Sequence, residues 1–212
     1  IDKIILATSD NVSDDQLAML CERAGFNVFR GSLDNVLDRF KKAIAKEDYA
    51  NIVRITGDCP LCDPEIIDDV IESHLNSKAE YTSNALKPSF PDGLDVEVIT
   101  KAAFEKVLKS AFLPSQLEHV TPYVYQNPTE FKINEHVSKM DFSKLRWTVD
   151  ELIDFEFVSE IYRLIYPKKP DFGMEDVLEL INSNCLRNFD NSGIKRNEGY
   201  AKSLLQDQKY GA

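Results

Sequence analysis

The sequence predicts an α/β protein built as a three-layer sandwich around a mostly parallel sheet, and three observations support this class. Short apolar runs rich in β-branched residues recur along the chain, as expected for buried strands. Amphipathic stretches of helical period separate these runs. The two kinds of segment alternate, which is typical of parallel strands joined by crossover helices. A chain of 212 residues is long enough for one domain with a substantial core.

Helix start and stop signals mark several of the expected elements. Asp63 before Pro64 is a typical helix start, and Ser13 and Gly25 are expected to begin and end an earlier helix. Strands are expected at residues 1–8, 27–31, 51–56, 79–84, 94–100 and 145–149, and helices at 13–25, 33–47, 63–76, 100–111 and 151–166. The pattern weakens after residue 181. We therefore expect one domain over residues 1–181 and a polar C-terminal extension or linker over residues 182–212.

The composition bounds the partners and the compartment. The net charge of −11, without a cluster of Lys and Arg, argues against nucleic acid as a partner. No apolar run approaches the roughly 20 residues that span a bilayer, so we expect no membrane partner. Four cysteines without a secretory segment indicate free thiols and a cytoplasmic location. An anionic substrate would need a divalent cation or a few basic side chains to approach so acidic a protein.

Two of the cysteines, Cys59 and Cys62, stand in a CPLC motif. A redox centre or half of a zinc site is one interpretation of such a motif. Zinc needs further ligands, and Cys21 and Cys185 are each isolated in the sequence. We therefore expect both residues of the motif to serve the turn and its packing.

Two aspartates, Asp58 and Asp150, follow expected strands that are far apart in the sequence. Ligands of open α/β sheets bind beyond the carboxyl ends of the strands, so both side chains are expected at one edge. Mg²⁺ takes one or two carboxylates and completes its shell with water and substrate phosphates. The pair therefore predicts a Mg²⁺ site for a nucleotide. The alternative is structural, because an aspartate after a strand often forms a turn or caps the next helix.

A phosphate-binding loop does not accompany this pair. Neither G-x-G-x-x-G nor G-x-x-x-x-G-K-[ST] occurs in the sequence, and the residues after the first expected strand contain no glycine. A nucleotide site with metal ligands but without a phosphate cradle is incomplete.

Seven segments carry a family resemblance, in matching order and spacing: ATSDN (7–11), FRGSLDNVLDRF (29–40), VRITGDCPLCDPEIID (53–68), YTSN (81–84), FPDGLDVEVIT (90–100), LEHVTPYVYQNP (117–128) and LRWTVDELIDFEFV (145–158). Together they resemble the cytidylyltransferase family of surface-polysaccharide biosynthesis, in its spore-coat-polysaccharide branch. More distantly, the chain is similar to the synthetases that form CMP-sialic acid and CMP-ketodeoxyoctonate.

The resemblance implies a fold and a reaction. The fold is a Rossmann-like sandwich with a small β arm, for which residues 131–140 are the candidate, and the arm suggests a homodimer. The reaction transfers CMP from CTP to a sugar for cell-surface polysaccharide biosynthesis, with release of pyrophosphate. CTP and the sugar are thus the implied partners, Mg²⁺ is the implied cofactor, and an acidic sugar is the expected acceptor.

The resemblance also implies roles for individual residues of this sequence. It implies that the metal ligands are Asp58 and Asp150. It implies contacts to the nucleotide from Thr8, Ser9, Asp10, Gly31, Ser32 and Arg39, and contacts to the sugar from Asp92, Asp95, Glu97 and His119. His119 is also the candidate general base, because imidazole titrates near neutrality. A structural role within its amphipathic stretch is the alternative for this histidine.

The sequence departs from the family at its start. Family members begin with a strand and a loop carrying Gln, Ala, Arg, Ser, Arg and Lys, which grips the triphosphate. Judged against a complete nucleotide-binding half, roughly forty residues are lacking, so we expect an N-terminally incomplete domain and no activity from this chain as written. Two alternatives remain: a nucleotide-sugar-dependent glycosyltransferase, disfavoured by the lack of Asp-x-Asp at the two strand ends, and a non-catalytic module of a larger fused protein.

Overall fold

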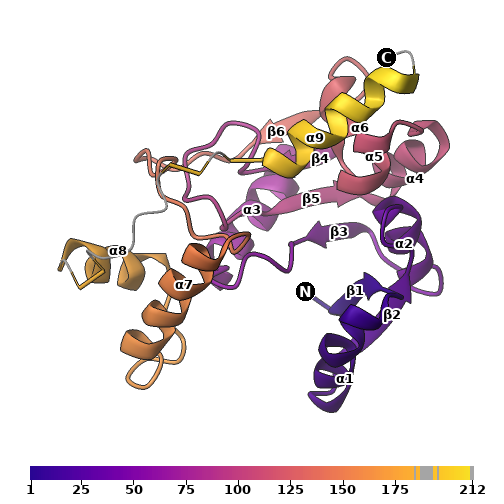
Figure 1. Ribbon diagram of the computed structural model, residues 1–212. Coiled ribbons are helices and arrows are strands. Elements are labelled where there is room, and N and C mark those ends of the chain that lie inside the picture. Colours follow the sequence, from indigo (N-terminus) through magenta and orange to yellow (C-terminus); the bar gives the residue numbers. More distant parts are fainter. Residues whose placement is uncertain (184, 187–192, 195, 211–212) are drawn as a thin grey trace. The chain divides into compact units, whose positions relative to one another are not determined.

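The computed structural model describes residues 1–183, 185–186, 193–194 and 196–210. The chain forms two compact units, each assembled from separate stretches of sequence. Unit 1 consists of Ile1–Ala50, Lys101–Glu130 and Asn197–Ala212, and unit 2 consists of Asn51–Thr100 and Phe131–Arg196. Figure 1 draws both units with their elements labelled. In the part of the chain that the structure describes, no helix is both long and apolar enough to cross a bilayer.

Unit 1 contains a two-stranded parallel sheet packed against helices. Strand β1 (Ile5–Ser9) pairs with β2 (Asn27–Gly31), from Ile5 opposite Asn27 to Ser9 opposite Gly31. The described helices of this unit are α1 (Asp15–Arg23), α2 (Val36–Ala43), α4 (Lys101–Ser110), α5 (Pro114–His119), α6 (Pro122–Gln126) and α9 (Glu198–Asp207), with short 3₁₀ turns η1 (Val12–Asp14) and η2 (Gln208–Tyr210). Helices α1 and α2 both pack against this sheet.

The first helix begins later than its sequence suggests. Ser13 lies inside η1 and Asp14 occupies the N-cap position of α1, so the prediction that Ser13 begins the helix is wrong. The Asp14 carboxylate makes no capping bond and binds Thr8 and Ser9 instead. The predicted stop at Gly25 is confirmed, since this residue has a φ of +86° just beyond the end of α1.

Unit 2 is built on a mixed sheet with the strand order β3-β5-β4-β6. Its strands are β3 (Asn51–Arg54), β4 (Tyr81–Ser83), β5 (Glu97–Thr100) and β6 (Ile133–Glu135). Strand β5 is antiparallel to β3 and β4, while β4 and β6 are parallel, so three of these four strands share one direction. No helix joins β4 to β5, and a parallel pair would need a crossover connection there. The predicted α/β class with a mostly parallel sheet is confirmed.

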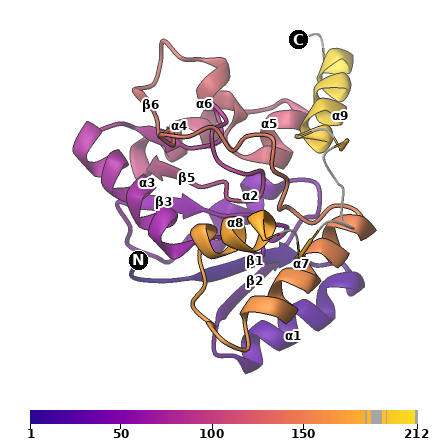
Figure 2. The ribbon, with the colours of Figure 1, turned by 90° about the vertical axis from the view of Figure 1, so that its left-hand side faces the viewer.

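Helices cover the strands of unit 2 and enclose its core. Helix α3 (Pro64–Ser77) packs against β4, β5 and β6. Helix α7 (Leu152–Ile165) packs against α8 (Met174–Asn182), and Figure 2 shows these two helices side by side. The expected start of α3 is confirmed, because Asp63 caps it through a 2.8 Å bond from Glu65 N. The most buried core side chains are Val70, Leu94, Val96, Val98, Trp147, Ile161 and Val177. Each such side chain contributes roughly 1.5–3 kcal/mol when removed from water.

Two expectations for the second half of the chain need correction. Residues 133–135 of the expected β arm form the edge strand β6, where Ile133 pairs with Tyr81, so this part of the stretch belongs to the sheet. Residues 145–149 do not form a regular strand, and Arg146 makes only an isolated bridge with Asp92. The reason is that the backbone N–H groups of Trp147 and Val149 bind two different loops rather than one neighbouring strand.

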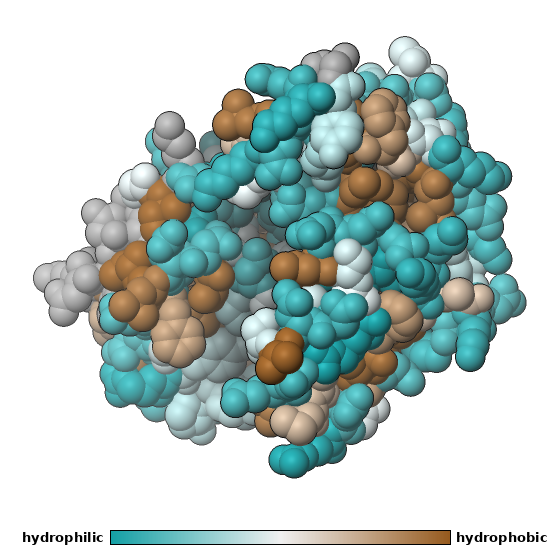
Figure 3. All heavy atoms as spheres, turned by 45° about the vertical axis from the view of Figure 1, so that its right-hand side comes forward, coloured by the Kyte–Doolittle hydropathy of each residue, from teal (hydrophilic) through white to brown (hydrophobic). Residues whose placement is uncertain are grey.

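The expected polar extension contains an ordered helix. Helix α9 packs against α5 within unit 1, and the Asp207 carboxylate accepts bonds from Ser115 N at 2.9 Å and Ser115 Oγ at 2.6 Å. The parts of this extension at residues 184, 187–192, 195 and 211–212 lie outside the described residues. The predicted domain boundaries remain predictions. On the face drawn in Figure 3, hydrophilic side chains cover much of the surface, with hydrophobic ones between them.

Candidate functional site

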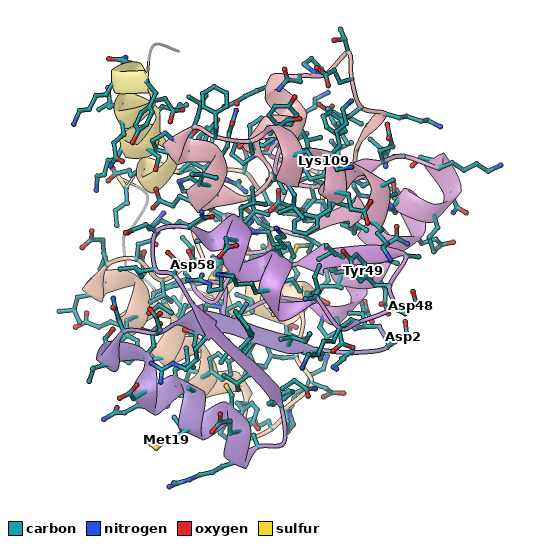
Figure 4. The ribbon with its side chains drawn as sticks, turned by 90° about the vertical axis from the view of Figure 1, so that its right-hand side faces the viewer. Asp2, Met19, Asp48, Tyr49, Asp58 and Lys109 are labelled. Carbon is teal, nitrogen blue, oxygen red and sulfur yellow. The ribbon has the colours of Figure 1, made fainter. Side chains whose placement is uncertain are left out.

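Asp58 lies on the loop that follows β3, and Figure 4 labels its side chain. The Asp58 carbonyl oxygen accepts a hydrogen bond from Val149 N at 2.8 Å and another from Thr148 Oγ1 at 3.1 Å. Thr148 and Val149 belong to a second loop of unit 2, and Asp150 is the next residue along it. Although 92 positions separate the two aspartates in the sequence, the backbone therefore brings them onto adjacent loops of unit 2.

A third loop of unit 2 joins the same place. Asp92 N donates to Leu145 O at 2.9 Å, and Trp147 N donates to Asp92 O at 2.6 Å. The next residue, Gly93, has a φ of +107° and passes so close to the 147–148 backbone that a Cβ would lie 2.5 Å from Thr148 N. Only a residue without a side chain fits this approach. The loops that carry Asp58, Asp92 and Asp150 are thus held together by their backbones.

The buried side chain of Arg146 links three carboxylates at this meeting point. It donates to both oxygens of Asp154, from Nε at 3.1 Å and from Nη2 at 2.9 Å. Nη2 also donates to Asp150 Oδ2 at 2.7 Å, and Nη1 donates to Asp92 Oδ2 at 3.2 Å. Burial alone would lower the pKa of Arg146, but the hydrogen bonds that it donates to Asp154 and Asp150 raise this pKa. This guanidinium therefore stays charged.

A second arginine, Arg196, extends the charge pattern. Its Nε lies 3.2 Å from Asp92 Oδ1, and its Nη2 binds Asp95 Oδ1. Burial raises the pKa of Asp92 above its ordinary value, although Arg196 and Arg146 oppose this. Burial likewise raises the pKa of Asp95 to about 6, with Arg196 opposing. The series Asp154, Arg146, Asp92, Arg196, Asp95 thus alternates in charge, with Asp150 attached to Arg146.

The donor set around Asp58 and Asp150 fits an open Mg²⁺ site. Both residues are exposed, and the charge of each carboxylate raises the pKa of Asp92, so each of them faces the Asp92 loop of unit 2. Within the described residues, no group of three or more His, Cys, Asp or Glu side chains is arranged to hold a metal. This excludes, for that part of the chain, a closed protein cage, whereas Mg²⁺ with one or two carboxylates retains positions for water and phosphate. The assignment of the two ligands remains a prediction.

The side chain of Asp150 has no capping role. Helix α7 begins after Glu151 at the N-cap position, and the backbone N–H groups of Asp150 and Glu151 both donate to the carboxylate of Asp154. The carboxylate of Asp150 is 54% exposed and binds Arg146 through Oδ2. In the described part of the chain, no hydrogen bond is made to its Oδ1. The structural alternative for this aspartate, a helix cap, is therefore wrong.

Glu97 begins strand β5 and lies in the interior of unit 2. It is 8% exposed, and its two carboxylate oxygens accept hydrogen bonds from Arg54 Nη1 and from the Tyr81 hydroxyl. Burial alone would lower the pKa of Arg54, but Glu97 raises it. The Glu97 carboxylate thus links β5 to both β3 and β4, and its expected contact with the sugar remains a prediction.

The predicted nucleotide-binding residues gather in unit 1 at the carboxyl ends of β1 and β2. Thr8 and Ser9 end β1, Gly31 ends β2, and Asp10 N donates to Gly31 O at 2.9 Å. Ser32 follows Gly31 directly, and its carbonyl oxygen accepts a hydrogen bond from Arg39 Nη1 at 3.0 Å. Gly31 packs closely on Arg39, since a Cβ would lie 3.3 Å from Arg39 Cγ. All six predicted residues therefore lie at one edge of a parallel sheet, where ligands of α/β proteins bind.

Two residues of this edge escaped the sequence analysis. Asp14 Oδ2 accepts bonds from Thr8 Oγ1 at 2.6 Å and Ser9 N at 3.0 Å, which lower the pKa of Asp14. Arg30 donates from Nε to Ser9 O at 3.0 Å and from Nη2 to Asn11 O at 2.8 Å. Together they fix the loop that follows β1. The sequence signal for Asp14 was its place at the start of an expected helix, where acidic residues are common.

His119 belongs to unit 1, whereas the other predicted sugar contacts belong to unit 2. It lies on α5, and its Nε2 is 3.0 Å from Ser203 Oγ on α9. The imidazole also packs edge-on against Tyr200, with ring centroids 5.2 Å apart. The Ser203 hydroxyl in turn donates to Glu118 Oε2 at 2.5 Å. These contacts give the histidine a structural role in docking α9 on α5.

Comparison with known proteins identifies the family of the chain. The family described as cytidylyltransferase matches residues 1–186. The spore coat polysaccharide biosynthesis protein SpsF of Bacillus subtilis is 34% identical over 188 residues, which cover 86% of this chain and 76% of that protein. An uncharacterized protein of Methanocaldococcus jannaschii is 40% identical over 166 residues, covering 77% and 67%. The solved structure of a cytidylyltransferase from Leptospira borgpetersenii superposes with a TM-score of 0.82 at 31% identity, covering 91% of this chain and 80% of that one.

Proposed function

Because the chain belongs to the cytidylyltransferase family, we propose that it transfers CMP from CTP to a sugar and releases pyrophosphate. The family makes the protein a nucleotidyltransferase. We further propose that the CMP-sugar serves the synthesis of a cell-surface polysaccharide, as the name of the Bacillus subtilis relative suggests. An acidic sugar is the acceptor to test first. The free thiols of the described residues fit a reducing compartment such as the cytoplasm.

One observation carries the proposal: the loops of Asp58 and Asp150 are joined by the 2.8 Å bond from Val149 N to Asp58 O. Two exposed carboxylates on joined loops would hold Mg²⁺ while leaving room for phosphate oxygens. When bound, the ion offsets the negative charge that develops on the phosphates during transfer. Nucleotidyl transfer needs little else from protein groups beyond positioning and charge stabilisation.

The remaining predicted residues position the two substrates. The edge formed by Thr8, Ser9, Gly31 and Ser32 is assigned to the nucleotide, with Asp14 and Arg30 holding its loop rigid. The loop of Asp92 and Asp95 is assigned to the sugar. Because the alternating carboxylates and arginines fix the geometry of that loop, it would present a preformed surface to the acceptor. His119 is not needed as a general base in this account.

The proposal is tested with the full-length protein, CTP, Mg²⁺ and a panel of acidic and neutral sugars. We expect pyrophosphate and a CMP-sugar in equal amounts. Asp58→Asn and Asp150→Asn should each lower kcat/KM by more than about 100-fold, beyond the effect typical of groups that only support a metal ligand. Asp68→Asn, an exposed aspartate on α3 of the same unit, is the matched control. Release of a nucleoside diphosphate from a donor sugar, without pyrophosphate, would instead indicate a glycosyltransferase.

A titration addresses the expectation that residues 1–212 do not by themselves bind the nucleotide. A protein of residues 1–212 should show no binding of CTP with Mg²⁺ in the micromolar range, because this sequence holds no phosphate-binding loop. Micromolar binding by this chain would contradict the expectation. A homodimer remains a further proposal, which the mass of the full-length protein in solution tests.

A further inference from the structure

The side chain of Arg146 connects three carboxylates of unit 2. Its side chain is only 5% exposed, yet it touches three carboxylates from three places in unit 2. Asp154 is fully buried and Asp92 is 12% exposed, whereas Asp150 is 54% exposed. One guanidinium therefore connects the interior of the unit with a side chain at its surface.

The ion pair of Arg146 and Asp154 gives this connection a rigid support. Two parallel hydrogen bonds, at 3.1 and 2.9 Å, fix the plane of the guanidinium as well as its position. Asp154 Oδ2 also accepts the backbone N–H groups of Asp150 at 3.1 Å and of Glu151 at 3.0 Å. The same carboxylate therefore fixes both the arginine and the backbone that carries Asp150.

The pair of Arg146 and Asp154 determines where the carboxylate of Asp150 points. An exposed aspartate on a loop samples several rotamers, and ordering it around a metal costs conformational entropy. The 2.7 Å bond from Arg146 Nη2 to Oδ2 selects one orientation in advance. Because Oδ1 has no hydrogen bond among the described residues, this orientation leaves one oxygen for a cation.

The charges around Arg146 allow it to stand beside a cation. An isolated arginine next to a metal ligand would repel the metal. Here the three carboxylates of Asp154, Asp92 and Asp95 face the two guanidinium groups of Arg146 and Arg196, so the negative charges exceed the positive ones before Asp150 is counted. The arginine therefore orients Asp150 without making the site positive.

We propose that Arg146 is the positioning residue of the metal site, holding the Asp150 carboxylate ready for the cation and coupling it through Asp92 to the sugar loop. The inference rests on the proposed function, since it takes Asp150 as a ligand and the 92–95 loop as the acceptor surface. It assigns no contact between Arg146 and either substrate. Outer groups of this kind typically change metal affinity or activity by 10- to 100-fold when they are replaced.

The test measures Mn²⁺ binding to the full-length protein with CTP, by the loss of the electron paramagnetic resonance signal of free Mn²⁺. In Arg146→Lys the charge is kept, but an ammonium cannot make the paired bonds to Asp154 and still reach Asp150. We expect Mn²⁺ to bind roughly 10- to 100-fold more weakly. Asp92→Asn, which keeps the shape of the side chain, should weaken binding by a smaller factor. Arg163→Lys is the control, because Arg163 is 66% exposed and, within the described residues, forms an ion pair only with Glu160.

Kinetics separate positioning from a merely structural role. Raising the Mg²⁺ concentration should restore kcat of Arg146→Lys to within about twofold of wild type, with the KM for Mg²⁺ increased roughly 10- to 100-fold. Unchanged Mn²⁺ affinity in a folded Arg146→Lys protein overturns the inference and leaves the proposed function intact. If Arg146→Lys does not fold, unchanged Mn²⁺ affinity in a folded Asp92→Asn protein overturns the inference instead. Wild-type protein that neither binds Mn²⁺ nor forms a CMP-sugar overturns the proposed function, and this inference with it.

Discussion

A single methyl group at Gly93 should separate the loops that form the candidate site. The φ of Gly93 is +107°, and an added Cβ would lie 2.5 Å from Thr148 N and 2.6 Å from the Trp147 carbonyl carbon. Atoms of these kinds attract each other at roughly 3.5 Å and repel steeply at shorter distances. We therefore predict that Gly93→Ala destabilises unit 2 and moves the Asp92 loop away from the loop of Asp150.

Two contributions set the size of this effect. A left-handed backbone costs a residue with a Cβ roughly 1–2 kcal/mol. Relieving the clash also weakens the bonds of Asp92 N to Leu145 O, at 2.9 Å, and of Trp147 N to Asp92 O, at 2.6 Å. One such bond lost costs about 1 kcal/mol. The sum is about 3 kcal/mol, which for a chain of this length lowers the midpoint of thermal unfolding by about 6–12 °C.

Circular dichroism during heating measures this shift, and Gly57→Ala is the matched control. Gly57 is also a loop glycine of unit 2, next to Asp58, but a Cβ there would meet no atom within 4 Å. Its replacement should change the free energy of unfolding by less than about 1 kcal/mol. If the two variants unfold within 2 °C or so of each other, the close packing of the two loops is refuted.

Three further predictions concern other parts of the chain. Burial raises the pKa of Asp95 from 3.8 to about 6. The folded protein therefore binds the proton of the Asp95 carboxyl group more tightly than the unfolded chain does. Wild-type stability should therefore fall by about 3 kcal/mol as the pH rises from about 4 to about 6, and Asp95→Asn should lack this fall when unfolding is followed across that range. Burial raises the pKa of Cys59, so a thiol reagent at pH 8 should modify exposed Cys185 and spare Cys59, as peptide mass spectrometry would reveal. Asp207→Ala removes two bonds that hold α9 and should speed hydrogen exchange throughout α9, while equal exchange would contradict the docking.

Local signals in the sequence predict much of this fold correctly. The cap at Asp63 and the left-handed stop at Gly25 depend only on neighbouring residues, so both follow from the chain itself. Such rules need no knowledge of which strands become neighbours. The loops of Asp58 and Asp150 are joined, as the expected strand ends predict, but the second loop runs through residues 145–149, which form no regular strand, so the rule that strand ends share one edge does not explain the junction.

Long-range partners account for the features that the sequence does not reveal. Asp14, not Ser13, occupies the N-cap position of α1, one residue later than expected, and its carboxylate binds Thr8 and Ser9 at the end of β1. The 145–149 stretch reads as a strand because of its apolar residues, yet its N–H groups bind loops. Arg146, a charged residue within that apolar run, was the one available signal of a buried ion-pair network, and its partners lie up to 54 positions away.

The central claim is that Asp58 and Asp150 hold one divalent ion, and iron-directed cleavage tests it most directly. Fe²⁺ replaces Mg²⁺ in the full-length protein with CTP, and ascorbate with peroxide then generates hydroxyl radicals at the bound ion. We predict that the backbone is cut near both residue 58 and residue 150, that excess Mg²⁺ suppresses both cuts together, and that either Asp→Asn change abolishes both. Cuts near only one of the two positions, or cuts that persist in Asp58→Asn, would contradict the account.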